Sequence, residues 1–128
     1  MTMRVLYIDD DRINTLLFVE ACRFAGGVET ETAYSGAEAL ELVQRWVPEL
    51  LVIDLHLPDT TGYVLLPALR ERLGAPTLPA FLCTADESSL VAEPARQAGF
   101  EGCWTKPVDL HVILAELARR GGRSTPCA

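Results

Sequence analysis

The chain has 128 residues, of which 49% are apolar, so it is long enough to bury a core as one globular domain. Its net charge of −7 argues against nucleic acid as a direct partner, because the phosphate backbone repels an acidic surface. No apolar run has the length of a membrane span, and the N-terminus lacks the apolar region of a signal peptide. We therefore expect a cytoplasmic protein that binds neither membrane nor nucleic acid.

The cysteines also bear on the compartment. Cys22, Cys83, Cys103 and Cys127 include no C-x-x-C spacing, and the first three lie in apolar segments. This pattern favours buried free thiols in a reducing cytoplasm over disulfides or a zinc site.

The first half of the chain has the patterns of three strands and two helices. Short apolar or alternating runs indicate the strands, and apolar residues at helical spacing indicate the helices. A glycine pair follows the first helix, and a Ser-x-x-Glu capping box opens the second. We predict strands at 4–8, 28–33 and 50–53, and helices at 12–25 and 35–46.

The second half has the patterns of two more strands and three more helices. We predict a strand at 80–83, a short strand within 100–105, and helices at 63–73, 86–98 and 108–120. A proline inside 63–73 predicts a kinked or loosened helix, and one inside 86–98 predicts a short or irregular helix. We expect residues 1–120 to form the domain and 121–128 to be a flexible C-terminal tail.

Strands that alternate with helices predict the fold class. Five such repeats imply an α/β fold with a five-stranded, doubly wound parallel sheet, covered by helices on both faces and joined by right-handed crossovers. Parallel strands place all their carboxyl ends at one edge of the sheet, which is the edge where such folds bind ligands.

Polar residues follow four of the predicted strands. They are Asp9, Asp10, Asp54, Thr84 and Lys106. Because all of them lie at strand carboxyl ends, we expect them to meet in space. Crowded carboxylates repel one another unless a cation neutralises them, and a set of hard oxygen ligands suits Mg²⁺.

Lys106 is the only lysine among eleven basic residues. A compact ammonium fits a tight anionic pocket in which a planar guanidinium would not fit. Thr84 adds a hydroxyl that can donate to a phosphoryl oxygen. A carboxylate nucleophile at Asp54, a Mg²⁺ site, a cation and a hydroxyl donor together predict phosphoryl transfer to Asp54.

Four segments in order, VLYIDDD, LLVIDLHLPDTTG, FLCTAD and TKP, resemble the motifs of a two-component response regulator receiver domain. The resemblance covers residues 4–120 and is closest to single-domain, chemotaxis-regulator-like receivers. It implies a flavodoxin-like (βα)5 receiver fold and a phosphoryl group received from a histidine kinase or a histidine phosphotransfer protein. It also implies signalling through protein–protein contact with an unidentified downstream protein, and no enzyme activity beyond the domain's own phosphorylation and dephosphorylation.

The resemblance assigns the metal and phosphoacceptor residues. Asp54 is implied to be the phosphoacceptor. Asp9, Asp10 and Asp54 are implied to hold Mg²⁺ (or Mn²⁺), and the backbone carbonyl of His56 is implied to complete the protein ligands.

The resemblance also assigns residues around the phosphoryl group. Thr84 and Lys106 are implied to contact it, and the Lys106–Pro107 peptide is implied to be cis. His56 and Asp86 are implied to flank the path of the water that hydrolyses the aspartyl phosphate, and so to modulate its lifetime.

One position departs from the family pattern. Similar receivers have an aromatic residue three positions before the lysine, and its ring moves together with the threonine; here that position is Cys103. Thr84 and Cys103 thus form the implied switch region without the usual ring. Alternation along a strand directs the neighbouring Trp104 to the opposite face, as a core or rim residue.

Three alternatives stay open at this point. The Asp-rich segment at 9–11 is compatible with a haloacid-dehalogenase-like phosphatase, although the chain has little room for a substrate cap. A degenerate receiver that serves only as an interaction module is a second alternative. We expect no effector domain after residue 128, so output would pass through another protein; a fragment of a hybrid kinase is the third alternative.

Overall fold

The computed structural model describes residues 3–85, 88–106, 109, 111–112, 115–116 and 118–119. Its five strands form one parallel sheet in the order β2-β1-β3-β4-β5. The strands are β1 (Met3–Ile8), β2 (Val28–Ala33), β3 (Leu50–Asp54), β4 (Ala80–Thr84) and β5 (Gly102–Thr105). The predicted parallel α/β fold is confirmed, with β3 at the centre of the sheet.

Four helices connect the strands. They are α1 (Arg12–Ala25), α2 (Gly36–Leu42), α3 (Gly62–Leu73) and α4 (Ser88–Ala98). The predicted strands are all present, and β5 is the short strand expected within the segment 100–105. Of the predicted helix at 108–120, only six residues in helical conformation are described, at 111–112, 115–116 and 118–119. The Lys106–Pro107 peptide and the predicted tail at 121–128 lie outside the described residues.

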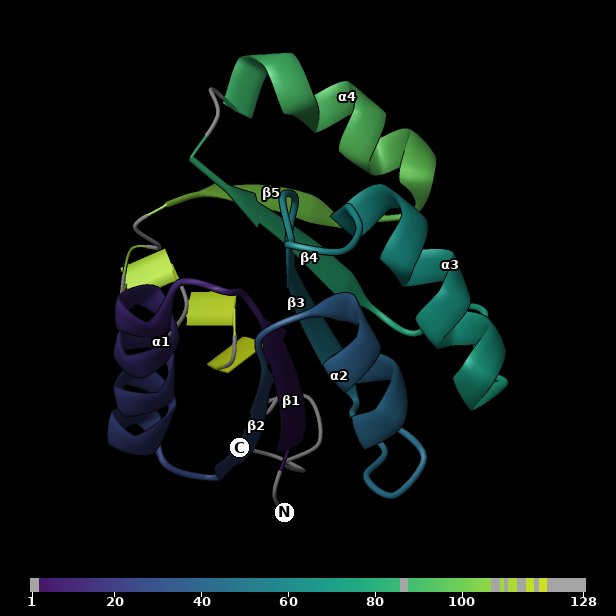
Figure 1. Ribbon diagram of the computed structural model, residues 1–128. Helices are drawn as coiled ribbons and strands as arrows, with labels where there is room; N and C mark the ends of the chain where they lie inside the picture. The colour runs from purple at the N-terminus through teal and green to yellow at the C-terminus, as the bar shows by residue number, and fades with distance from the viewer. Residues whose placement is uncertain are drawn as a thin grey trace.

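Helices cover both faces of the sheet (Figure 1). α1 lies on one face, together with the described helical residues between 111 and 119, and α2, α3 and α4 lie on the other. Each face has its own apolar cluster, and alternate residues of β1 serve the two: Val5 and Tyr7 pack with Phe18 of α1, whereas Leu6 and Ile8 pack toward α2 and α3. β3 is buried along its whole length, which explains its continuous apolar run.

Polar side chains cap the amino ends of α1 and α2. Asp11 accepts hydrogen bonds from the backbone N–H groups of Ile13 and Asn14, so it is the N-cap of α1. The predicted capping box of α2 is present in a shifted form: Ser35 accepts from the Glu38 N–H, and Glu38 accepts from the N–H of Tyr34 rather than from that of Ser35.

α2 is shorter than predicted. It ends at Leu42 instead of near residue 46. The next N–H groups, those of Gln44 and Arg45, donate to carbonyls three residues earlier, so the last turn tightens and the regular helix ends.

The two prolines do not interrupt their helices. α3 continues through Pro67, and α4 runs for eleven residues through Pro94, so the prediction of a short or irregular helix there is wrong. Both prolines face solvent, where water can hydrate a carbonyl that loses its helical donor. Val91 and Ala95 of α4 are buried on the opposite side and hold that helix against the core.

The loop after β3 is held in place by two close approaches. Asp59 accepts hydrogen bonds of 2.9 Å from the N–H groups of Gly36 and Ala37 at the start of α2, and these bonds lower the pKa of Asp59. At Gly62 a Cβ atom would lie 2.9 Å from the backbone oxygen of Asp54 and 2.7 Å from a Leu82 methyl group. A residue without a side chain therefore lets α3 begin directly against the end of β3.

The amino end of the sheet is tied together by one guanidinium. Arg70 of α3 donates to the backbone oxygen of Leu78, before β4, and to that of Gly99, before β5.

Within the described part of the chain, no helix has the length and apolar content that a bilayer span requires.

Candidate functional site

Two buried carboxylates lie side by side at the carboxyl edge of the sheet. Ile8 pairs with Ile53 in the parallel register of β1 and β3, so Asp9, which follows β1, lies at the same level as Asp54, the last residue of β3. Both side chains are almost completely buried. Asp10, the next residue along the chain, is exposed at the mouth of the site.

Lys106 joins the two carboxylates. Its ammonium lies 3.1 Å from Asp54 Oδ2, and 3.2 and 3.3 Å from the two oxygens of Asp9. The backbone N–H of Lys106 donates to the Thr84 carbonyl at 2.7 Å, which fixes the end of β5 against the end of β4. Four of the predicted site residues, Asp9, Asp10, Asp54 and Lys106, therefore meet as the sequence predicts.

The burial of Asp54 has a marked electrostatic effect. Removal from water, with the Asp9 charge beside it, raises the pKa of Asp54 to about 6, although Lys106 acts in the opposite direction. Burial also disfavours the Lys106 ammonium, but Asp54 and Asp9 outweigh it and raise the pKa of Lys106 above its usual value. The lysine is therefore fully charged, and it lowers the repulsion between two carboxylates that solvent cannot screen.

Asp9 is fixed by further donors. Its Oδ2 accepts a hydrogen bond of 2.8 Å from the Tyr7 hydroxyl, and its Oδ1 accepts one of 2.9 Å from the backbone N–H of Asp11. Burial raises the pKa values of the Tyr7 phenol and of the neighbouring Cys83 thiol, so both groups keep their protons.

Three carboxylates at this edge are suitable ligands for a divalent cation. One oxygen each from Asp9, Asp10 and Asp54 can be chosen so that all three lie within 4.8 Å of one another. Opposite ligands of an octahedral Mg²⁺ ion are about 4 Å apart, so small movements would bring these oxygens into range. The residues present thus fit the predicted metal, and their hard oxygens suit Mg²⁺ or Mn²⁺.

The other predicted residues lie around this centre. Thr84 is buried at the end of β4, one residue beyond the partner of Asp54 in the sheet register. The His56 backbone N–H lies 3.4 Å from Asp54 Oδ1, and its side chain is exposed on the loop after β3. Asp86 and Pro107 lie outside the described residues.

Cys103 and Trp104 point to opposite faces of β5, as predicted. Cys103 is half-buried against the cluster that α2, α3 and α4 cover. Trp104 packs in the cluster under α1, where its ring stacks on Phe81 with centroids 4.6 Å apart. The position that the resemblance assigns to a moving aromatic ring thus holds a small thiol, and the nearest aromatic residue in sequence belongs to the other face.

Sequence reasoning missed two contributors to the site. It assigned no role to Asp11, whereas this residue caps α1 and donates its N–H to Asp9. It gave no role to Tyr7, although strand alternation places residues 7 and 9 on the same face and could have indicated the contact.

The profile of a known family covers most of the chain. The family is described as response regulator receiver domain, and the match extends over residues 5–118. The chain belongs to the response regulator receiver domain family. The receiver domain is a component of two-component signalling, so the haloacid-dehalogenase-like alternative is excluded.

Individual relatives agree with this assignment. The chain is 31% identical over 110 residues to the polar-differentiation response regulator DivK of Brucella ovis, which covers 86% of this chain and 89% of that protein. It is 36% identical over 107 residues to an uncharacterized 14.6 kDa protein of Leptolyngbya boryana, covering 84% of this chain and 81% of that one.

Solved structures share the fold. A putative response regulator from Chloroflexus aurantiacus superposes with a TM-score of 0.84 at 27% identity, over 93% of this chain and 97% of that one. The chemotaxis response regulator CheY4 of Vibrio cholerae gives a TM-score of 0.83 at 26% identity, over 93% and 98% of the two chains.

The raised pKa of Asp54 predicts a stability that depends on pH. Since this pKa is about 6 in the folded chain and 3.8 ordinarily, ionisation favours the unfolded state. The folded protein should lose stability as the pH rises from about 4 to about 6, and the loss should be complete above that range. Asp54→Asn should therefore be more stable than the parent at about pH 7.5, by on the order of 1–3 kcal/mol, and the difference should vanish near pH 4.

Urea unfolding in a metal chelator measures this difference. Asp59→Asn is the matched control, because the pKa of Asp59 is lowered by its backbone donors and its replacement should destabilise the protein at neutral pH. An Asp54→Asn variant that is no more stable than the parent at about pH 7.5 would contradict the prediction.

Proposed function

We propose that this receiver domain takes a phosphoryl group onto Asp54 from a phosphohistidine of a histidine kinase or a histidine phosphotransfer protein. The observation that carries the proposal is the Lys106 ammonium lying between the carboxylates of Asp54 and Asp9 at the carboxyl end of β3. An Asp54 oxygen attacks the phosphorus of a phosphohistidine whose other ring nitrogen carries a proton. The bond between phosphorus and the imidazole nitrogen breaks, its electron pair stays on that nitrogen, and neutral histidine leaves. Beyond its own phosphorylation and dephosphorylation, we propose no enzyme activity.

The residues around Asp54 neutralise the charge that the phosphoryl group brings. Lys106 moves from the Asp54 carboxylate to a phosphoryl oxygen, and the Thr84 hydroxyl donates to another. Most of the rate enhancement then comes from position and electrostatics, because this reaction needs little further covalent assistance.

Asp9, Asp10 and Asp54, with the backbone carbonyl of His56, would hold Mg²⁺ or Mn²⁺. When bound, the ion supplies positive charge to the transferring phosphoryl oxygens. Asp10 contributes most directly, because it is exposed at the mouth of the site, whereas Asp9 is fully buried and shares its oxygens with the Lys106 ammonium.

Signalling would pass to a downstream protein through Thr84 and Cys103 on the neighbouring strands β4 and β5. Because Cys103 has no ring to move, we propose that the change reaches this face through the backbone ends of β4 and β5, which the bond from Lys106 N–H to the Thr84 carbonyl connects. We also propose a cytoplasmic location, which the free thiols of Cys22, Cys83 and Cys103 support.

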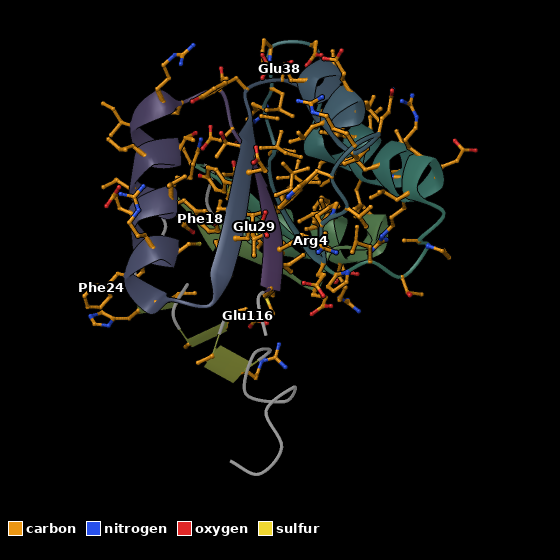
Figure 2. The ribbon with its side chains drawn as sticks, turned by 90° about the horizontal axis from the view of Figure 1, so that it is seen from below. Arg4, Phe18, Phe24, Glu29, Glu38 and Glu116 are labelled. Atoms are coloured by element: carbon orange, nitrogen blue, oxygen red, sulfur yellow. The ribbon has the colours of Figure 1, made fainter. Side chains whose placement is uncertain are left out.

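The first turns of α1 supply a surface on which the phosphodonor can dock. α1 begins directly beside the acidic edge, and its apolar side chains Ile13, Leu16 and Leu17 are 72%, 60% and 56% exposed. A donor that brings its phosphohistidine to Asp54 must lie against these turns, so we propose that they contact apolar residues next to the donor histidine. Phe18 points from the same helix to the sheet, whereas Phe24, which is 80% exposed, lies at the far end (Figure 2).

The phosphoacceptor is tested by mapping label. With a phosphohistidine donor or acetyl phosphate and Mg²⁺, the parent should be labelled at Asp54, and Asp54→Ala should lose nearly all label. Among the described residues, the other buried carboxylate beside Lys106 is Asp9, and Tyr7 and the Asp11 N–H already engage both of its oxygens. Full labelling of Asp54→Ala would contradict the assignment. Absence of label in the parent, together with failure to bind beryllofluoride, would indicate the degenerate, interaction-only receiver.

The metal assignment is tested by a pair of adjacent substitutions. Asp10→Ala should weaken Mg²⁺ binding and leave the stability of the metal-free protein intact. Asp11→Ala should keep Mg²⁺ affinity but lose about 1 kcal/mol of stability, because it removes the N-cap of α1. Mg²⁺ titration and urea unfolding check the two effects; unchanged Mg²⁺ affinity in both variants would place the metal elsewhere.

The lifetime of the aspartyl phosphate should depend on His56 and Asp86, which we propose flank the path of the attacking water. His56→Ala should change the self-dephosphorylation rate several-fold, on the order of 1 kcal/mol in the barrier, without altering Mg²⁺ affinity. Asp86→Ala should do the same. Decay of labelled protein at fixed pH and Mg²⁺ measures both rates; parental rates in both variants would end the proposal.

The docking surface is tested by two apolar residues on one helix. Ile13→Ser should slow phosphotransfer from any histidine kinase that labels the parent, and it should leave labelling by acetyl phosphate unchanged. Phe24→Ser is the matched control, because it lies eleven residues or about 16 Å further along α1 and is similarly exposed. Equal transfer to Ile13→Ser and to the parent would contradict the docking proposal.

A further inference from the structure

A buried tyrosine lies directly beneath the acidic edge, and the phosphoryl chemistry proposed above does not use it. Tyr7 is fully buried in β1, and its hydroxyl donates to Asp9 Oδ2 at 2.8 Å. A buried hydroxyl loses its hydration on folding, which is unfavourable unless it finds a good acceptor. A phenylalanine would fill the same apolar space without that cost, so the hydroxyl has a use beyond packing.

The surroundings of Tyr7 leave its hydroxyl little freedom. The ring stacks on Phe18 of α1, with centroids 4.4 Å apart and planes 12° from parallel. Cys83 of β4 lies against the hydroxyl from the other side and is itself fully buried. The phenol therefore cannot turn to solvent, and its O–H stays directed at Asp9.

The Asp9 carboxylate is held in one orientation by three separate groups. Tyr7 donates to Oδ2, the Asp11 N–H donates to Oδ1, and the Lys106 ammonium contacts both oxygens. Of these donors, only Lys106 is long and flexible enough to leave when a phosphoryl group or a cation arrives. After it leaves, the Tyr7 hydroxyl and the Asp11 N–H are the contacts that keep the plane of the carboxylate fixed.

We propose that Tyr7 is a positioning residue that holds Asp9 in the orientation needed to receive the divalent cation at the phosphorylation site. The inference rests on the proposed Mg²⁺ site. Hydrogen-bond partners of a metal-binding carboxylate set its direction, and their loss commonly weakens binding by an order of magnitude. Without the hydroxyl, the buried Oδ2 would lose its closest donor, and the carboxylate would rotate toward Lys106 and away from the cation.

Tyr7→Phe tests the proposal, because it removes only the hydroxyl and keeps the ring that stacks on Phe18. In calorimetric titration with Mg²⁺ alone, Tyr7→Phe should bind about tenfold more weakly than the parent. Phe18→Leu is the matched control: it removes the stacking partner and so lowers stability, but it keeps the hydrogen bond and should leave Mg²⁺ affinity within about twofold of the parent.

A spectroscopic signature separates positioning from a general structural effect. Mg²⁺ should change the near-ultraviolet absorbance of tyrosine in the parent, because the ion polarises the acceptor of the Tyr7 hydroxyl, and this change should be absent from Tyr7→Phe. Parental Mg²⁺ affinity in Tyr7→Phe, or an equal loss in Phe18→Leu, would overturn the proposal. If the parent itself binds no Mg²⁺, the metal site of the proposed function fails, and this inference fails with it.

Discussion

The structure depends on one ammonium shared by two carboxylates that are almost completely buried. Asp9 and Asp54 end neighbouring strands at the same level, and their mutual repulsion in a poorly solvated site would open the sheet edge if nothing opposed it. Lys106 opposes it from the end of β5, two strands away from β3. Two negative charges against one positive charge leave the edge short of cations, and a divalent cation held by the three carboxylates would offset that deficit.

The apolar sheet beneath this edge holds the two carboxylates and the single ammonium in place. All five residues of β3 and all five of β4 are buried, and β1 supplies packing to both faces. Each carboxyl end is fixed as part of a rigid layer, so the site residues keep their spacing although burial disfavours the Asp54 charge. The favourable burial of the apolar sheet therefore offsets the unfavourable burial of charge at its edge.

The residues at the carboxyl edge could be predicted from the sequence, because a parallel arrangement of the strands is enough to bring their carboxyl ends together. Apolar runs that end in Asp9, Asp54 and Thr84 predict three strand ends, and a parallel sheet must bring them together. The helix ends were harder to predict. Pro94 suggested an irregular helix, but the burial of Val91 and Ala95 outweighs a missing hydrogen bond on the solvent side.

Two contacts were not predicted because each lies in a segment that already had an adequate explanation. The carboxylate of Asp11 turns back to cap its own helix, and Tyr7 reaches the residue two positions further along its strand. Both lie inside segments whose composition was already explained by a strand and an acidic rim. When one role already accounts for a residue, a second role is easily overlooked. For this reason the residues of a site are predicted more easily than the residues that hold them in position.

The Arg70 contacts hold the end of the sheet that lies opposite the carboxyl edge. One guanidinium ties the segment before β4 and the segment before β5 to α3, so the amino end of the sheet behaves as a fixed base. The whole length of β4 separates these contacts from Thr84 and the carboxyl edge. A surface that responds to the charge of Asp54 would therefore be expected at the carboxyl ends of the strands and not beside Arg70.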